Sequence, residues 1–229
     1  MNHKSILPAI IGSSTAELIT LPICTLKTVY QSGKYDIITA ISNIYSKRGI
    51  LGFYSGSTPA ILAQIFASTY KLILFDRISG YMPHGDIFTI LAGIIASMTC
   101  VFFTNPIDYL RVSYQMGNSI SLKGIYRGLY PNLAKGLVGG ATFLPIRKIL
   151  INHYPEVETW KMGLCSAVIS TTIVHPLDYF KTYLMSSSER GINKSLIRNP
   201  YKGLSLNLLR IIPHFVIMTE TMDHVKRCI

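Results

Sequence analysis

The sequence predicts an all-α membrane protein with six transmembrane helices, arranged as three repeats of two helices. Three observations predict this fold class. Charged residues make up only 14% of the 229-residue chain and hydrophobic residues 49%, whereas soluble domains carry about 25% charged residues. Six apolar stretches each approach the length that crosses a bilayer, about 20 helical residues. A proline followed five residues later by a base recurs in three of these stretches.

The six apolar stretches cover roughly 6–30, 58–78, 87–110, 132–151, 162–184 and 204–225. None of them is purely apolar, and the charges within them are Glu17, Lys71, Lys135, Arg147 and Arg210. A charged side chain that faces lipid costs several kcal/mol. We therefore expect these residues to face the protein interior or a water-filled cavity.

The proline pattern reads Pro22-Ile-Cys-Thr-Leu-Lys27, Pro106-Ile-Asp-Tyr-Leu-Arg111 and Pro176-Leu-Asp-Tyr-Phe-Lys181, with its copies 84 and 70 residues apart. Recurrence at such a spacing indicates a triplicated module. The repeats are expected at about 1–80, 81–153 and 154–229, and together they form a single domain over 1–229. Proline inside a helix kinks it, so Pro22, Pro106 and Pro176 should bend the odd-numbered helices.

The loops after stretches one, three and five carry nine bases and two acids. The opposite loops, around 79–86 and 152–161, carry one base and three acids. Such asymmetry orients membrane proteins, so the basic loops should share one side, with both termini on the other. The net charge is +11, but the bases form no single patch of the kind that binds nucleic acid. No nucleic-acid partner is expected.

Each basic loop ends with an aromatic residue and a glycine, in the segments Tyr54-Ser-Gly56, Tyr126-Arg-Gly128 and Tyr201-Lys-Gly203. Together with the proline motifs, these segments resemble the mitochondrial carrier family. Its signature is Pro-x-[Asp/Glu]-x-x-[Lys/Arg], a loop and aromatic-[Lys/Arg]-Gly, three times over. The resemblance covers essentially the whole chain.

The resemblance implies six tilted helices around a central cavity, with a short matrix helix in each repeat. It also implies a monomeric solute carrier of the mitochondrial inner membrane, with both termini on the intermembrane-space side. No enzyme activity, cofactor or metal is expected, since the histidines and cysteines are scattered. The chain is shorter than most family members and rich in Ile, Tyr, Ser, Asn and Lys. This composition is typical of an AT-rich genome, such as that of a parasite or a large DNA virus.

In this family, the acid of one repeat pairs with the base of the next and closes the matrix side. The resemblance implies the pairs Asp108–Lys181 and Asp178–Lys27. The third pair would join Arg111 to position 24, where this chain has a cysteine. The ring therefore has two of its three bonds. Gln31 and Gln115, four residues after two of the bases, are implied to brace the bonds.

A second gate lies on the cytoplasmic side of family members, on the even-numbered helices. The residues of this chain that match it are Asp76, Asp223 and Lys226. Ser79 and Lys148 stand where partners are required, so we expect a weak cytoplasmic gate. Arg77 or Arg147 could instead substitute from neighbouring positions.

The family's substrate contacts lie near the midplane, and the corresponding residues are Glu17, Ala63, Gln64, Lys135, Gly136, Thr171 and Arg210. Two cations, Lys135 and Arg210, facing one cavity favour an anion with phosphate or carboxylate groups. Glu17 could accept a hydrogen bond from a substrate amino group, couple a proton, or pair with a neighbouring base.

The substrate favoured by this pattern is a nucleotide or deoxynucleotide, taken up by exchange. The chain lacks the run of three arginines and three methionines of ADP/ATP exchangers, so it is not expected to be a standard ADP/ATP carrier; another phosphorylated anion is also compatible with the pattern. A carboxylate carrier is one alternative. A carrier fold without transport, acting as an adaptor or a proton leak, is another.

The three module glycines begin the even-numbered helices, and free amides at helix N-termini bind phosphate. With the adjacent bases they resemble the family's cardiolipin sites, whose residues here are Gly56, Arg127, Gly128, Lys202 and Gly203. Ser55 replaces the base of the first repeat, so the first site should be weaker.

Overall fold

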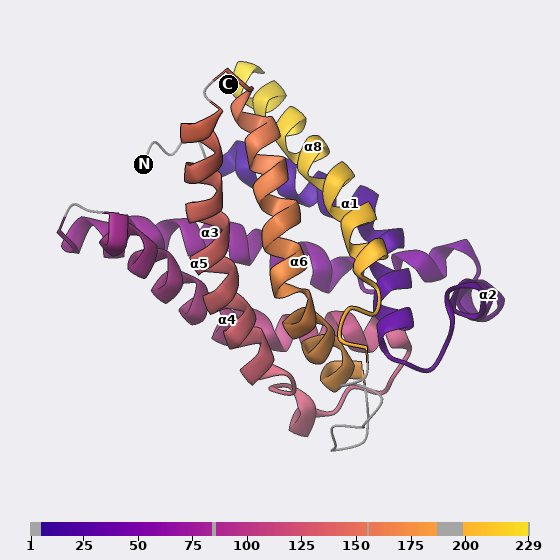
Figure 1. Ribbon diagram of the computed structural model, residues 1–229. Helices are drawn as coiled ribbons and strands as arrows, with labels where there is room; N and C mark the ends of the chain where they lie inside the picture. Colours follow the sequence, from indigo (N-terminus) through magenta and orange to yellow (C-terminus); the bar gives the residue numbers. More distant parts are fainter. Residues whose placement is uncertain (1–5, 84–85, 155, 187–198, 229) are drawn as a thin grey trace.

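The computed structural model describes residues 6–83, 86–154, 156–186 and 199–228, and these ranges are helices and turns without a strand. The six long helices are α1 (Ile6–Gln31), α3 (Ser57–Tyr81), α4 (Asp86–Met116), α5 (Leu129–His153), α6 (Thr159–Ser186) and α8 (Leu204–Cys228) (Figure 1). Each of them contains one of the six predicted apolar stretches. The all-α fold class is confirmed.

Short helices lie in the loops that the sequence analysis placed on the matrix side. In the first repeat they are α2 (Ile37–Arg48) and η2 (Ile50–Tyr54), whereas the second repeat has only the turn η3 (Leu122–Gly124). The expectation of a short helix in every repeat thus reduces to one 3₁₀ turn in the second, because residues 117–128 are too few for more. In the third repeat the segment 187–198 lies outside the described residues.

The six long helices form a closed ring in chain order, with α8 packed against α1 (Figure 1). The first, third and fifth of the six long helices, α1, α4 and α6, also contact one another. These are the helices that the sequence analysis called odd-numbered. Each of them contains its motif proline, Pro22, Pro106 or Pro176. Proline removes the hydrogen bond to the residue four positions earlier, which allows these helices to bend inward; the bend itself remains a prediction.

Glycines allow close packing of α8 against both of its neighbours, on its backbone at α1 and on a side chain at α6. A Cβ atom added to Gly12 of α1 would lie 2.7 Å from Met222 Cγ and 2.8 Å from the Met218 carbonyl oxygen. One added to Gly163 of α6 would lie 2.9 Å from Phe215 Cζ. The first contact also places the start of α1 beside the end of α8, so both ends of the described chain lie at one end of the bundle (Figure 1).

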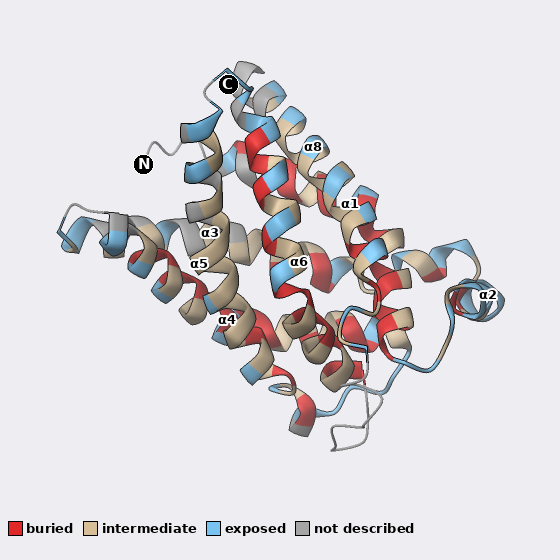
Figure 2. Ribbon diagram, viewed as in Figure 1, coloured by how far each residue is buried: buried red, intermediate tan, exposed pale blue. Residues whose placement is uncertain are grey.

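Burial follows the pattern of a protein that is solvated by lipid. The interior of the ring holds polar side chains, among them Glu17, Thr20, Lys27 and Gln31, and large apolar side chains such as Phe102 and Ile173 lie exposed outside (Figure 2). Two segments, Ile50–Ala67 and Ile90–Met116, are long and apolar enough to cross a membrane by composition alone. In α1 and α6 the charged residues Glu17, Lys27 and Asp178 are buried, which lowers the hydropathy of these helices without exposing those charges to lipid. The side chains of Lys71 and Arg147, which were also expected to face the interior, lie outside the described residues.

Candidate functional site

Two ion pairs join α1, α4 and α6 at the residues expected to form the matrix gate. Lys181 Nζ of α6 donates to Asp108 Oδ2 of α4 at 2.6 Å. Lys27 of α1 pairs with Asp178 of α6. These contacts link α4 to α6 and α6 to α1. Their role as a gate remains a prediction.

The third bond has an unexpected partner. Arg111 Nη2 of α4 lies 2.8 Å from Cys24 Sγ and also pairs with Glu17 of α1. Glu17 precedes Cys24 by seven residues, which is two turns along the same helix face. Glu17 thus provides the carboxylate that position 24 lacks, and α1 is joined to α4 after all.

The two cations that were expected to contact substrate pair with the same carboxylates. Arg210 Nη2 of α8 donates to Glu17 Oε2 at 2.6 Å, and Lys135 of α5 pairs with Asp178 Oδ1. Glu17 and Asp178 therefore each hold one cation of the ring and one substrate-contact cation. His214 Nδ1 lies 3.9 Å from Glu17 Oε2.

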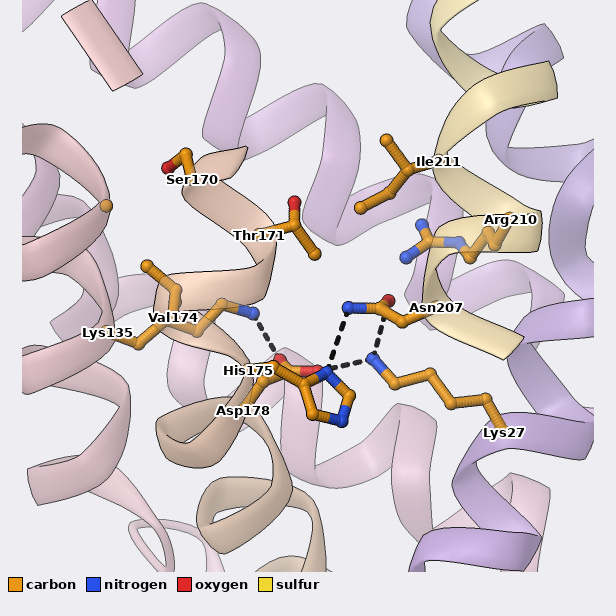
Figure 3. A pocket seen from close by; sticks show the side chains of 11 residues that line it. Lys27, Lys135, Ser170, Thr171, Val174, His175, Asp178, Asn207, Arg210 and Ile211 are labelled. Atoms are coloured by element: carbon orange, nitrogen blue, oxygen red, sulfur yellow. Dashed lines mark hydrogen bonds and ion pairs between the residues drawn. The ribbon is translucent and has the colours of Figure 1, made fainter. Parts of the chain in front are cut away.

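A cavity of about 250 Å³ lies directly beside these pairs. Its walls are formed by Lys27, Lys135, Gly139, Ser170, Thr171, Val174, His175, Asp178, Asn207, Arg210 and Ile211. Lys135 and Arg210 reach it from opposite sides (Figure 3). Asn207 Oδ1 accepts from Lys27 Nζ at 2.9 Å, and Asn207 Nδ2 lies 3.3 Å from His175 Nδ1. Among the described residues, no cluster of His, Cys, Asp and Glu could hold a metal ion.

The other predicted contact residues lie outside the cavity lining. Glu17 is fully buried and pairs with Arg210, which does line the cavity. Gly136 faces α4, because a Cβ added there would lie 3.5 Å from Val101 Cγ2. Ala63 is buried and Gln64 half-buried in α3, and neither lines the cavity.

Gln31 and Gln115 contact other groups than the ion pairs they were expected to brace. Gln31 Nε2 donates to the Lys202 carbonyl oxygen at 3.2 Å, and Gln115 Nε2 to Thr25 Oγ1 at 3.2 Å. Their Cγ atoms pack on the module glycines: a Cβ on Gly203 would lie 3.1 Å from Gln31 Cγ, and one on Gly56 3.4 Å from Gln115 Cγ.

In the third repeat an apolar residue packs against a module glycine in the same way as the two glutamines. A Cβ on Gly128 would lie 3.3 Å from Met185 Cγ, and Met185 occupies the position of the two glutamines. Packing against a glycine therefore explains all three residues, polar or not. Repeat-to-repeat alignment contains this signal, since each of the three follows its base by four residues.

The cytoplasmic gate cannot be compared in the same way. The side chains of Asp76, Asp223 and Lys226 lie outside the described residues, as does that of Lys148. This gate stays a prediction.

The module glycines begin helices as expected. Gly56 and Gly128 are the N-caps of α3 and α5 and have φ of 79° and 72°. Gly203, just before α8, has φ 83°. These left-handed backbones favour glycine, and Lys202 Nζ, beside the third, lies 4.6 Å from the centre of the Tyr30 ring.

A cation from another helix contacts the residue before the first module glycine. Arg48 Nη1, at the end of α2, donates to Ser55 Oγ at 3.1 Å and to the Tyr114 carbonyl oxygen at 2.7 Å. A groove of about 500 Å³ lies next to it, lined by Gly56, Ser57, Thr58, Pro59, Leu62, Ile107, Leu110 and Tyr114. Arg48 thus brings a positive charge from another helix to the position where the motif base is missing, which the motif comparison did not predict; a role of Arg48 in lipid binding remains a prediction.

The chain is similar in sequence to known proteins. The sequence profile of the family described as "Mitochondrial carrier protein" matches residues 2–86 and 152–229. A mitochondrial carrier-like protein of Acanthamoeba polyphaga mimivirus is 35% identical over 98% of this chain and 97% of its own length. A probable chloroplast envelope ADP,ATP carrier of Arabidopsis thaliana is 24% identical over 96% of this chain and 70% of its own length. A mitochondrial coenzyme A transporter of Xenopus tropicalis is 23% identical over 91% and 81%, respectively.

Proposed function

Because this chain belongs to the mitochondrial carrier family, we propose that it exchanges a small anionic metabolite, a nucleotide or deoxynucleotide, across the mitochondrial inner membrane by alternating access. Members of this family are multi-pass membrane transporters and not enzymes. The observation that carries the proposal is the pair of cations, Lys135 and Arg210, that reach one cavity from two repeats. Both termini would face the intermembrane space.

The cavity offers an excess of positive charge. Lys27, Lys135 and Arg210 line it, and Asp178 is the one acid in its lining. Among the described groups, Arg210 Nε is buried without a hydrogen-bond partner. A buried donor left unpaired is costly, and an arginine fork matches the oxygens of a phosphate. A phosphorylated anion would balance the excess charge of the cavity.

The ion pairs correspond to one state of a transport cycle, in which one end of the bundle is closed. The bonds among α1, α4 and α6 close the bundle at the end where their basic loops begin, and the cavity lies beside them. In alternating access these bonds must break each cycle. The desolvation of buried charges offsets much of the attraction within such a pair, so substrate binding can supply the net free energy needed to open them.

A nucleotide is favoured by two arguments. Ser170, Thr171, His175 and Asn207 add neutral hydrogen-bonding groups to the cavity, which a base or sugar requires and a simple dicarboxylate does not. Two relatives are carriers of ADP and ATP and of coenzyme A by name. A dicarboxylate held by the same two cations is the alternative substrate.

A carrier fold that has lost transport is the second candidate function. The departures at Cys24, Ser79 and Lys148 favoured it in the sequence. The pairing of Arg111 with Glu17 weakens that argument, because the ring retains three links despite the cysteine. Ser79 and Lys148 remain as its support.

The test is uptake of radiolabelled nucleotides, deoxynucleotides, phosphate and dicarboxylates into cardiolipin-containing liposomes that hold the purified protein. Lys135→Ala and Arg210→Ala remove the cavity cations. Lys161→Ala is the matched control, since this exposed lysine pairs only with the exposed Glu158 among described acids. The proposal expects uptake of nucleotides that both cavity variants abolish and the control retains. Uptake of dicarboxylates alone would favour the alternative substrate, and no uptake by folded protein would favour the non-transporting fold.

A further inference from the structure

The carboxylate of Glu17 lies at a junction between the ring of ion pairs and the cavity. Its side chain is 1% exposed, and that of Arg111 is 15% exposed. Leaving a buried cation without a counter-charge costs several kcal/mol. Since position 24 has no carboxylate, the closed arrangement of α1 and α4 requires the charge of Glu17.

Glu17 divides its two oxygens between two cations. Oε1 accepts from Arg111 of α4 and Oε2 from Arg210 of α8. One negative charge therefore neutralises only part of the charge of two guanidinium groups, and the three groups together keep a positive net charge. Arg210 also lines the cavity, whereas Arg111 does not.

A second carboxylate, that of Asp178, is also shared between two cations. It holds Lys27 and Lys135 in the same manner. The two carboxylates differ in their position, because Asp178 occupies the motif position of its repeat and Glu17 lies seven residues before its own. That displacement is about 10 Å along the helix axis, towards the substrate-contact residues.

We propose, on the basis of the transport function proposed above, that Glu17 is the third acid of the matrix-end ring and also a built-in competitor of the substrate for Arg210. Without substrate, its carboxylate occupies Arg210 and holds Arg111. An anion that enters the cavity displaces the Glu17 carboxylate from Arg210. When the anion leaves, the carboxylate pairs with Arg210 again. Glu17 is thus a positioning residue that lowers the affinity for anions and keeps the closed state intact.

The chain offers a variant with unchanged net charge for testing this. Glu17→Gln removes the shared charge, and Cys24→Asp adds a charge at the motif position, next to Arg111. The double variant has the net charge of the parent, with the carboxylate moved two turns away from Arg210. Asp108→Asn is a matched control, because it removes a ring acid that does not line the cavity.

The experiment measures two quantities on the purified, cardiolipin-bound proteins. They are the thermal unfolding midpoint without added ATP or phosphate, and the affinity for ATP and inorganic phosphate from the shift of the midpoint. We expect Glu17→Gln to lower the midpoint and Cys24→Asp to restore most of it. We expect the affinity of both the single and the double variant to rise about fivefold or more, in the usual range of coupling between sites. Asp108→Asn should lower the midpoint and leave the affinity within about twofold of the parent.

The outcomes separate this inference from the transport proposal. No rescue of the midpoint by Cys24→Asp would overturn the ring role of Glu17. An affinity of the double variant equal to that of the parent would overturn its role as a competitor. If the parent transports none of the tested anions, the proposed function fails, while the midpoints still decide the ring role. Should Glu17→Gln not fold, Glu17→Asp, which keeps the charge on a shorter side chain, is expected to give a smaller loss with the same rescue.

Discussion

Asp178→Asn should destabilise the closed state strongly, because one carboxylate neutralises two cations there. The side chains of Asp178 and Lys27 are 11% and 8% exposed, and that of Lys135 is 36% exposed. Asparagine has nearly the same shape, so the substitution removes the charge and little packing. The effect therefore measures electrostatics.

The magnitude follows from the burial of each partner. Removing one member of a buried ion pair costs about 3–5 kcal/mol. Lys27 keeps its bond to Asn207 Oδ1 at 2.9 Å, which favours the lower end, and the exposed Lys135 adds no more than about 1 kcal/mol. A loss of about 3 kcal/mol lowers the unfolding midpoint of a protein of this size by about 6–12 °C.

The assay is thermal unfolding of the purified protein in detergent with cardiolipin, followed by intrinsic fluorescence or a thiol-reactive dye. Glu158→Gln is the control, since that acid is 62% exposed and pairs with the 52% exposed Lys161. The control should unfold within about 1 °C of the parent, as exposed pairs contribute little. An Asp178→Asn midpoint as close to the parent as the control would refute the view that shared carboxylates hold the bundle closed.

Three further results are expected. Cys24→Asp alone should slow the initial rate of exchange in liposomes, because Arg111 gains an adjacent acid that must release it in each cycle; an unchanged rate would count against the ring. Gly12→Ala should lower the unfolding midpoint, since overpacking costs about 1–3 kcal/mol and its Cβ would lie 2.8 Å from a backbone oxygen; Gly139→Ala, with its nearest atom at 3.8 Å, should not. Arg48→Ala should reduce the stabilisation by added cardiolipin, and an equal response to the lipid would remove Arg48 from that site.

Much of this arrangement was accessible from the sequence. The six helices follow from apolar length, and the contacts Asp108–Lys181 and Asp178–Lys27 follow from the family resemblance that the repeated motif carries. These features depend on local composition or on threefold symmetry. A single sequence with three copies of a motif contains both kinds of information.

The features that matching of motif positions did not predict are those that break the symmetry. Pairing of Glu17 with a neighbouring base was one open alternative, but its partner Arg111 was not identified. Glu17 neutralises Arg111 from a different position than the motif acid, and Arg48 of a preceding helix donates to Ser55, the residue at the position of the missing base. Position-by-position comparison finds no substitute in such cases, because neutralisation depends on distance in space. The seven-residue spacing from Glu17 to Cys24 would have indicated the first, had helix faces been compared as well as motif positions.

Loop length explains the remaining difference. A short helix was expected in each repeat, and the second repeat has the turn Leu122–Gly124 instead. A family resemblance transfers an element only where the chain is long enough to form it.

Counter-exchange in liposomes tests the central claim most directly, that Lys135 and Arg210 hold a transported anion in one cavity. Labelled nucleotide is offered to liposomes that contain the parent protein, either loaded with unlabelled nucleotide or empty. We predict rapid uptake into the loaded liposomes only, abolished by Lys135→Ala and retained by Lys161→Ala. Uptake that is equally fast with Lys135→Ala, or no uptake by folded parent protein in loaded liposomes, would contradict the account.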